Sequence, residues 1–394
     1  MFDARALQVH RFALSLAGLV ATLPLVQLIP LPPNLALNLP GREDLSQALA
    51  LAGVVPGWTP MSLTPDLTWR SFLALVPPLA VFGAVLTLDE RQRTSLLWPV
   101  LLAGVLAVGL CAVQITTRSP SAYLWSWTEP GFASGLFANR NHMATLCAST
   151  LPFAVILAIA GARDRARGRL RLWIGLSYLG LVVVALPVIQ SRAGVGIGLL
   201  SLTASLFAAW TVMGRRLDSR LLATGLVAAA ALTATVLFGL DGVAARFEGL
   251  DLTNGRAQHW PFVIQAAQAY LPVGSGIGSF DAVYRSVEPL QQLDETYFNA
   301  AHNEYLQIWL EAGWLGIGLL VAFLVWFGRR SWTTWTAGPD SGFRRAATIA
   351  IGVILLHSLV EYPLRTETLA VFFALCCGIL EFAGKSQGEK LKPA

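Results

Sequence analysis

Long apolar runs recur throughout the chain, and they limit its possible folds more than any other feature. A helix of about 20 apolar residues, rising about 1.5 Å per residue, crosses the hydrocarbon core of a membrane. Only 13% of the 394 residues are charged and the mean hydropathy is +0.59, whereas soluble domains are about one-quarter charged. The sequence therefore predicts an all-α polytopic membrane protein with ten spans. The runs lie near residues 12–30, 71–88, 96–116, 142–160, 172–190, 193–213, 221–240, 311–328, 346–360 and 367–383.

The distribution of charge predicts how these spans are oriented. If the N-terminus is cytoplasmic and the ten spans alternate, 19 of the 28 Lys and Arg residues face the cytoplasm, while 15 of the 23 Asp and Glu residues face the opposite, outer side. Cytoplasmic loops carry an excess of Lys and Arg, so we expect both termini in the cytoplasm. The first run leads into LIPLPPN without a small-residue cleavage site, and we expect it to remain as a span. The pI of 9.2 then reflects topology and gives no reason to expect nucleic-acid binding.

One domain over residues 1–394 is expected, because most connections between the runs are short. The long connections, residues 31–69, 117–141 and 241–301, all fall on the outer side, and residues 384–394 form a cytoplasmic tail. In the longest, RAQHWPFVIQAAQAYL has the apolar spacing of a helix and PVGSGIGSF is rich in turn residues. This loop is therefore expected to carry short helices and fold onto the membrane face. Its glycines suggest close backbone approach, because neither a preceding strand nor a following GK[ST] marks a phosphate-binding loop.

Every basic residue expected on the outer face is an arginine, because the three lysines all lie in the tail. Arg grips phosphate through paired hydrogen bonds, so this face suggests an anionic ligand. The alternative is a composition that favours Arg throughout the chain. Arg192 stands apart because it lies with Ser191 between two apolar runs, where a charge indicates a functional site or snorkels to the headgroups. The outer arginines are Arg42, Arg70, Arg118, Arg140, Arg192, Arg246, Arg256, Arg285 and Arg365.

Four of the five histidines are expected to approach the outer face. A single His on an apolar face is more often a structural residue, and we keep that interpretation for His142, His259 and His357. His302 differs because a polar loop, Asn303 and Glu304 surround it where the chain enters the membrane. His302 is therefore the candidate functional histidine.

Metal and disulfide chemistry find little support in the sequence. The outer loops lack the Asp-x-Asp spacing that would hold a hard cation on a sugar diphosphate, so a metal-independent site without a cofactor is expected. All four cysteines lie inside apolar runs, where they behave as small hydrophobic residues.

Four segments of the chain resemble the O-antigen ligase and polymerase family of bacterial membrane glycosyltransferases. They are GLFANRNHMA (135–144), QSRAG (190–194), NGRAQHWPFVIQAAQAYLPVGSGIGSF (254–280) and AHNEYLQIWLEAGWLGIGLL (301–320), with HSLVEYPLR (357–365) as a weaker fifth. The resemblance implies a fold similar to C-type (GT-C) glycosyltransferases, with 241–301 as the large periplasmic loop. It also extends the expected number of spans from ten to as many as twelve.

The resemblance implies specific roles for three residues. The arginine of the SR turn and the arginine that opens the loop helix hold the diphosphate in such enzymes, and the histidine of the HN segment is the proposed base. These roles fall on Arg192, Arg256 and His302. Polar residues of the same regions are candidate substrate-binding residues. They are Arg140, Asn141, Arg285, Asn303 and Glu304.

The resemblance further implies a transfer reaction in the bacterial inner membrane. The donor is a glycan linked to undecaprenyl diphosphate, and the acceptor is a sugar of the lipid A core or of a growing O-antigen or exopolysaccharide. A protein O-oligosaccharyltransferase would share these motifs. A transporter or flippase for lipid-linked oligosaccharide is the alternative outside enzymes. It would place polar residues along the bundle interior, whereas here they gather at one face.

Overall fold

Nine long helices, together with shorter ones, make up the described part of the protein. The computed structural model describes residues 10–126, 128, 130–160, 168–214, 219, 224–226, 256–290 and 298–381. The only strands within these ranges are β1 (Pro30–Leu31) and β2 (Thr59–Pro60), which pair antiparallel with Pro30 opposite Pro60. The long helices are α2 (Arg11–Gln27), α5 (Pro65–Thr87), α7 (Leu97–Thr117), α8 (Arg140–Ala160), α9 (Gly168–Ile189), α10 (Arg192–Val212), α14 (Glu304–Thr336), α15 (Gly342–His357) and α16 (Glu367–Leu380).

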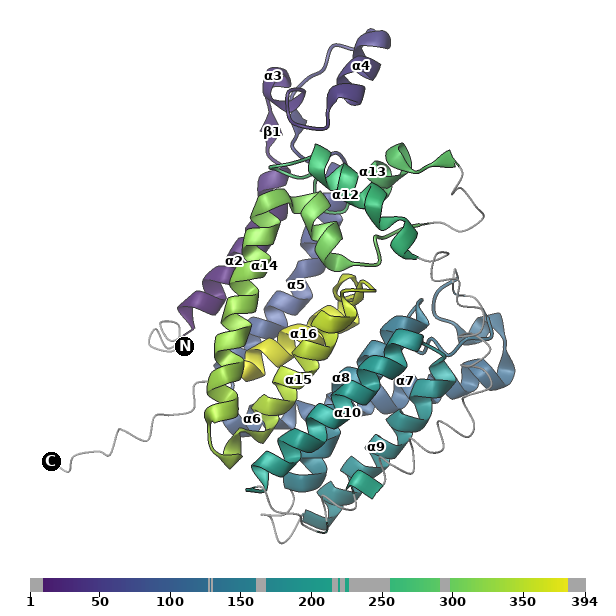
Figure 1. The fold of residues 1–394 in the computed structure, drawn as a ribbon, viewed down its shortest axis with the longest axis vertical. Helices are drawn as coiled ribbons and strands as arrows, with labels where there is room; N and C mark the ends of the chain where they lie inside the picture. The colour runs from purple at the N-terminus through teal and green to yellow at the C-terminus, as the bar shows by residue number, and fades with distance from the viewer. Residues whose placement is uncertain are drawn as a thin grey trace, which may run out of the picture.

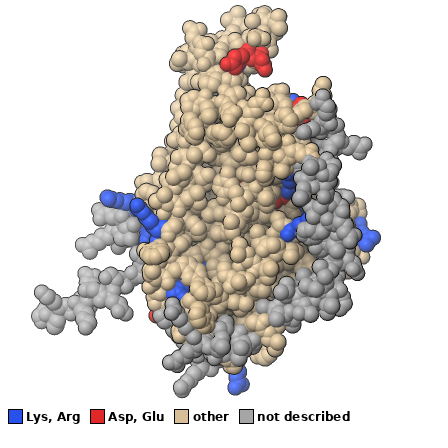
Figure 2. Space-filling model, viewed as in Figure 1, with Lys and Arg blue, Asp and Glu red and all other residues tan. Residues whose placement is uncertain are grey.

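Each apolar run within the described ranges coincides with one of these long helices. Among the described residues, α5, α8, α9, α10, α14 and a continuous segment from Glu90 to Thr117 are long and apolar enough to span a membrane. Helices α2, α15 and α16 are apolar but shorter, and nearly all of the run at 221–240 lies outside the described residues. The protein is an all-α polytopic membrane protein, as the sequence predicts. The face in Figure 2 agrees, because most of it carries no charged side chain.

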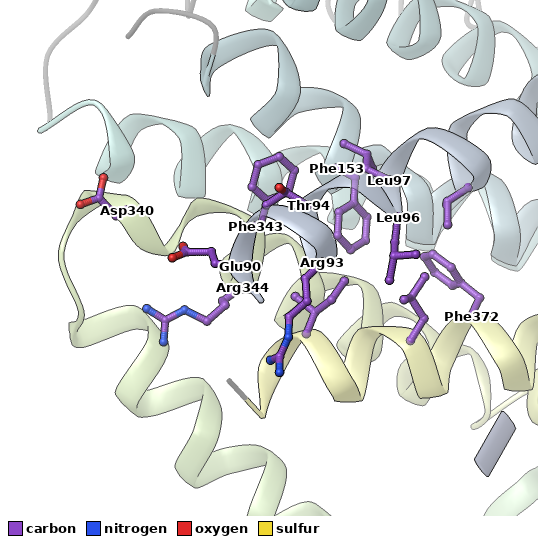
Figure 3. A pocket seen from close by; sticks show the side chains of 13 residues that line it. Glu90, Arg93, Thr94, Leu96, Leu97, Phe153, Asp340, Phe343, Arg344 and Phe372 are labelled. Carbon is purple, nitrogen blue, oxygen red and sulfur yellow. The ribbon is translucent and has the colours of Figure 1, made fainter. Parts of the chain in front are cut away.

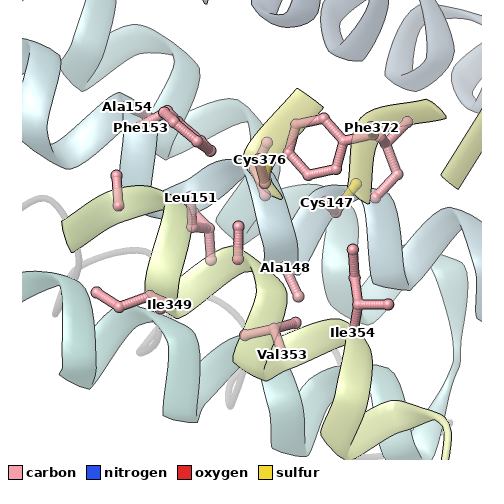
Figure 4. Packing of buried hydrophobic residues seen from close by; sticks show 14 of the residues in the cluster. Cys147, Ala148, Leu151, Phe153, Ala154, Ile349, Val353, Ile354, Phe372 and Cys376 are labelled. Atoms are coloured by element: carbon pink, nitrogen blue, oxygen red, sulfur yellow. The ribbon is translucent and has the colours of Figure 1, made fainter. Parts of the chain in front are cut away.

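Helix α8 lies at the centre of the bundle. After Arg140, Asn141 and His142 it is apolar or small on every side, a pattern typical of a buried helix. It packs against α7, α9, α10 and α15, and α16 in turn packs against α5 and α15 (Figure 1). Small residues allow these helices to approach closely: a Cβ atom on Gly175 of α9 would lie 2.6 Å from the carbonyl oxygen of Ala154. Figure 4 shows the core where α8, α15 and α16 meet, including Leu151 and Ile354.

Helix α14 contains a break at Gly313 that positions its first three turns. Gly313 has φ +54° and ψ −145°, and a Cβ atom there would lie 2.2 Å from the carbonyl oxygen of Pro272. The loop at 272–278 docks against this break through Ser275 N–Leu310 O (3.0 Å), Gly276 N–Glu311 O (2.9 Å) and Trp314 N–Pro272 O (3.0 Å). The glycines of GSGIGS therefore do allow close backbone approach.

Short helices cover the end of the bundle at which α14 begins. They are α3 (Pro33–Ala36), α4 (Glu43–Leu51), α12 (Trp260–Ala269) and α13 (Phe280–Val287), with a 3₁₀ turn, η2, at Arg256–Gln258. In Figure 1, α12 and α13 lie beside the start of α14, and α3 and α4 extend beyond them. The short helices expected in the long loop are thus present in its described part. Residues 241–255 and the tail at 384–394 lie outside the described residues.

Candidate functional site

Four separate segments bring polar side chains together where α8 and α14 begin. Asn141 comes from the first turn of α8, where its N–H donates to Asn139 Oδ1 (2.8 Å). Arg256 opens η2, and His302 precedes α14. Glu361 lies in the turn between α15 and η5 (Pro363–Arg365).

Glu361 is the centre of this group, which we call the Glu361 cluster: Asn139, Asn141, His142, Arg256, His302 and Glu361. The carboxylate is 1% exposed. Its Oε2 atom lies 3.2 Å from His302 Nδ1, 3.5 Å from Asn139 Nδ2 and 3.8 Å from His142 Nε2. Its Oε1 atom accepts from Arg256 Nη1 and Asn141 Nδ2.

The environment keeps Glu361 ionised. Burial raises the pKa of the Glu361 carboxyl, but the hydrogen bond with His302 and the charge of Arg256 outweigh it, so that the pKa lies below its usual range. A buried carboxylate with several hydrogen-bond donors is typical of such a shift. The cluster therefore contains a fixed negative charge.

His302 is neutral at neutral pH. Burial lowers its pKa below the ordinary value of 6.5, although the hydrogen bond to Glu361 acts in the opposite direction. With Glu361 ionised, Nδ1 carries the proton and donates to it, which leaves the lone pair on Nε2. The ring is flanked by Tyr362 and Phe298, with ring centres 4.9 Å and 5.5 Å away.

The backbone of His302 adopts an unusual conformation. Its φ is +47°, in the left-handed region, where residues other than glycine are uncommon. Such a conformation is stabilised by its surroundings and is found disproportionately at functional sites. The next residue, Asn303, caps α14 by accepting from the N–H groups of Tyr305 and Leu306, both at 3.1 Å.

Two of the predicted substrate-binding residues are used to build the site. Asn303 is the cap just described. The carboxylate of Glu304 accepts from Ser358 Oγ (2.8 Å) and from the N–H of Leu364 (2.7 Å). Glu304 thus ties the start of α14 to the segment that carries Glu361, which places His302 opposite that carboxylate.

The predicted arginines are distributed unequally around the cluster. Arg256 contacts Glu361 directly, with 41% of its side chain exposed. Arg192 is exposed at the first turn of α10, whose cap Ser191 accepts from the N–H of Gly194 at 3.0 Å. A Cβ atom on Gly194 would lie 2.3 Å from Ala144 Cβ, so this turn packs against the first turn of α8. Arg192 therefore lies at the same end of the bundle as the cluster without being bonded into it.

The other two predicted arginines have local partners. The Arg140 guanidinium lies 3.9 Å from the centre of the Phe132 ring. Arg285 forms an ion pair with Asp281 on α13 at 2.8 Å and is largely exposed. Neither contact joins the Glu361 cluster.

The remaining histidines differ from one another. His357 Nδ1 lies 2.6 Å from Thr145 Oγ1 and links α15 to α8, and His259 hydrogen-bonds Tyr284 and stacks on Phe298 with ring centres 4.2 Å apart. Both arrangements agree with a structural role. His142, interpreted in the same way from the sequence, instead faces Glu361.

Glu361 is the residue that the sequence interpretation missed. Its signal was present, because it is an acid directly after an apolar run, and an ionisable residue there indicates function. It lies in HSLVEYPLR, the weakest of the matching segments. Nothing in that segment shows that four distant parts of the chain converge on it.

A pocket lies at the opposite end of the bundle, where α14 turns into α15 (Figure 3). Its volume is about 40 Å³, and its lining includes Glu90, Arg93, Arg344 and Phe153. The Arg93 guanidinium donates to the carbonyl oxygens of Leu88 (2.8 Å), Leu86 (3.0 Å) and Gly378 (3.4 Å). Because these bonds hold neighbouring helices together, the Arg93 guanidinium has a structural role in this pocket. The Glu361 cluster is therefore the better candidate site. Within the described residues, no group of three or more His, Cys, Asp or Glu side chains is arranged to hold a metal ion.

Residues 177–321, from within α9 to the middle of α14, match the family described as O-antigen ligase. This segment of the chain is therefore similar to O-antigen ligases. The match includes Arg192, Arg256 and His302, whereas Asn141 and Glu361 of the cluster lie outside it. The similarity points to a membrane glycosyltransferase type of activity.

Comparison with curated proteins gives no match. Among solved structures, a chain from a peptidoglycan synthase complex that coordinates polymerization and crosslinking is similar over 95% of this chain and 96% of that chain. The sequence identity is 16% and the TM-score is 0.41.

Proposed function

We propose that this protein transfers a glycan from undecaprenyl diphosphate to the hydroxyl of an acceptor sugar, as its similarity to O-antigen ligases suggests. The reaction takes place at the periplasmic face of the bacterial inner membrane, without a metal ion. The acceptor belongs to the lipid A core or to a growing polysaccharide. The observation that supports this most is a buried His302 that shares the Glu361 carboxylate with Arg256 at the end of an apolar bundle.

His302 is the general base of this reaction. Its Nε2 atom accepts the proton of the acceptor hydroxyl while that oxygen attacks the sugar carbon joined to the diphosphate. The bond between that carbon and the diphosphate oxygen breaks, and the electron pair leaves with the diphosphate. A base that is neutral at working pH can take this proton directly.

Arg256 and Arg192 stabilise the negative charge that develops on the departing diphosphate. Arg256 has five N–H donors, and Glu361 uses only part of this capacity. Arg192 adds a guanidinium at the N-terminus of α10, where the helix dipole also favours an anion. Charge placed where it develops in the transition state is an effective form of catalysis.

A reconstituted transfer assay tests this function. The purified protein is mixed with a glycan linked to undecaprenyl diphosphate and with lipid A core or a sugar repeat as acceptor. His302→Gln keeps a hydrogen-bonding side chain but removes the base, so turnover should fall by roughly 10²- to 10⁴-fold. The protein should remain folded, as judged by its unfolding temperature.

The chain offers a matched control at the opposite end of the bundle. His10 Nδ1 lies 3.2 Å from Glu381 Oε1, the same distance as in the His302–Glu361 pair, and this pair is also buried. His10→Gln should therefore leave turnover close to wild type. If the wild-type protein forms no product but moves the lipid-linked glycan across vesicles, the transferase proposal is wrong and the flippase alternative is favoured. If His302→Gln retains most of its turnover, His302 is not the base.

A further inference from the structure

The two oxygens of Glu361 have different partners. Oε2 faces His302 Nδ1 at 3.2 Å, and Oε1 accepts from Arg256 and Asn141. The carboxylate is 1% exposed, so it is shielded from direct contact with a bulky glycan. It touches two of the three residues to which the proposed function assigns chemistry, His302 and Arg256, although no role in the reaction has been assigned to it.

We propose that Glu361 is the positioning residue of the site: one carboxylate oxygen orients the His302 base and the other holds Arg256 beside it. This proposal rests on the proposed function. It concerns how the chain prepares His302 and Arg256 before substrates arrive.

The contact with Oε2 decides which nitrogen of His302 can act. A carboxylate accepts hydrogen bonds but cannot donate one, so Nδ1 must carry the proton and Nε2 must hold the lone pair. When Nε2 accepts the acceptor's proton, the ring becomes positively charged. The adjacent carboxylate stabilises that charge, as the acid does in a serine protease triad.

The contact with Oε1 connects the base to the leaving-group side of the reaction. Before the donor binds, Arg256 and His302 share one negative charge. A bound diphosphate competes with Glu361 for the Arg256 guanidinium, and the Glu361 charge then acts more strongly on His302. Donor binding thereby increases the basicity of His302 in the complex that needs it.

Several groups from every surrounding segment set the charge at His302. The charged and titratable groups that face the pair are Arg256 from η2, His142 from α8, His259 from the turn before α12, His357 from α15, and Tyr362 beside Glu361. Of these, Arg256 is the fixed positive charge in direct contact with the carboxylate. Removing the Glu361 charge leaves His302 beside that positive charge alone.

Glu361→Gln is the direct test, measured as kcat against pH in the transfer assay. The expected loss in kcat is roughly 10²- to 10⁴-fold. The acidic limb of the profile should also move to lower pH. The reason is that a neutral amide no longer stabilises protonated His302, so protonation, which inactivates the base, requires more acid. A purely structural role would lower activity equally across pH.

Glu367→Gln is the matched control, because Glu367 is an exposed carboxylate at the start of α16, six residues away in the chain. Its kcat and acidic limb should match wild type. In a His302→Ala background, Glu361→Gln should cause only a small part of this loss in kcat, because the His302 partner has already been removed and only the Arg256 contact remains.

Three results would overturn the proposal: a Glu361→Gln kcat within threefold of wild type, an acidic limb that stays in place, or a full additional loss in the His302→Ala background. If the Gln variant does not fold, Glu361→Asp decides. Its shorter side chain withdraws the carboxylate from Nδ1, so kcat should fall while the acidic limb stays closer to that of wild type, and an unchanged kcat contradicts the proposal. Failure of the wild-type protein to transfer glycan would instead reject the proposed function.

Discussion

Arg256 is the most exposed residue of the cluster, with 41% of its side chain accessible, although its guanidinium contacts a buried carboxylate. The exposed part of the guanidinium keeps donors available to a ligand from outside the cluster. Arg192, exposed at the same end of the bundle, provides a second guanidinium group. Two guanidinium groups suit the oxygens of the proposed diphosphate better than two ammonium groups, because each can donate a pair of parallel hydrogen bonds.

Replacing either arginine with lysine tests whether paired hydrogen bonds from the guanidinium group are needed for transfer. Arg192→Lys and Arg256→Lys keep the charge but remove the paired hydrogen bonds, so each should lower transfer at least about tenfold. Arg70→Lys is the matched control, because Arg70 is an exposed arginine on α5. Turnover is measured in the transfer assay with saturating acceptor. A double variant with near-wild-type turnover would rule out paired hydrogen bonds to the diphosphate.

The sequence predicted part of this site and missed its centre. His302 was identifiable because it belongs to a polar triplet at a membrane entrance, whereas Arg256 was singled out by the resemblance to O-antigen ligases and polymerases. Asn303 and Glu304 were identified for the same reason, but the structure uses them to cap α14 and to bind Ser358 and Leu364. The role of Glu361 depends on four segments far apart in the sequence, and no local pattern contains that information.

At the scale of elements, the break in α14 determines where His302 lies. The Trp314 N–H bonds to the carbonyl of Pro272 rather than within the helix, and Gly276 donates to the Glu311 carbonyl. Glu311 is itself fully buried and accepts from Arg365 Nη2 at 2.7 Å. The first turns of α14, the 272–278 loop and η5 are therefore held together as one unit.

Gly313→Ala should disturb this unit. An alanine would need a positive φ and would place Cβ 2.2 Å from the Pro272 carbonyl, so we expect a loss of about 1–3 kcal/mol in stability. Transfer should fall as well, because His302 moves with the first turns of α14. The measurements are the unfolding temperature in detergent and turnover in the transfer assay.

Gly318→Ala in the same helix is the control. Nothing lies within 4 Å of a Cβ atom at Gly318, and alanine is favoured over glycine in a helix by up to about 1 kcal/mol. It should therefore leave stability unchanged or raise it. Equal effects of the two substitutions would mean that the docked break does not position the site.

Apolar patterning predicted the helices of this bundle far better than it predicted the break. Gly313 lies in LEAGWLG, within an apolar run where a continuous helix is the default expectation. Only the approach of the 272–278 loop makes a positive φ favourable there. A sequence pattern over a few residues cannot predict a contact between residues about forty positions apart.

At the scale of the whole molecule, the orientation in the membrane follows from the charge distribution and stays a prediction. Cysteine labelling with a membrane-impermeant reagent measures it. Leu290→Cys, 80% exposed after α13, should be labelled from outside, whereas Ser219→Cys should react only after the membrane is opened. The four native cysteines are buried and should stay unlabelled. The reverse pattern would place the Glu361 cluster on the cytoplasmic side and contradict the proposed function.

Helix α8 is surrounded by protein along its length, although its composition suits lipid. During synthesis α8 is made after α7 but before α9, α10 and α15, so lipid tails are the first neighbours of the faces that these three later helices cover. Later helices then displace those lipids one after another, and the small side chains of α8 exchange hydrocarbon for protein at little difference in polarity. Assembly of the protein thus replaces lipid around α8 with later helices. Asn141, at the start of α8, gains its bond to Glu361 only after a segment more than a hundred residues further along the chain has been made.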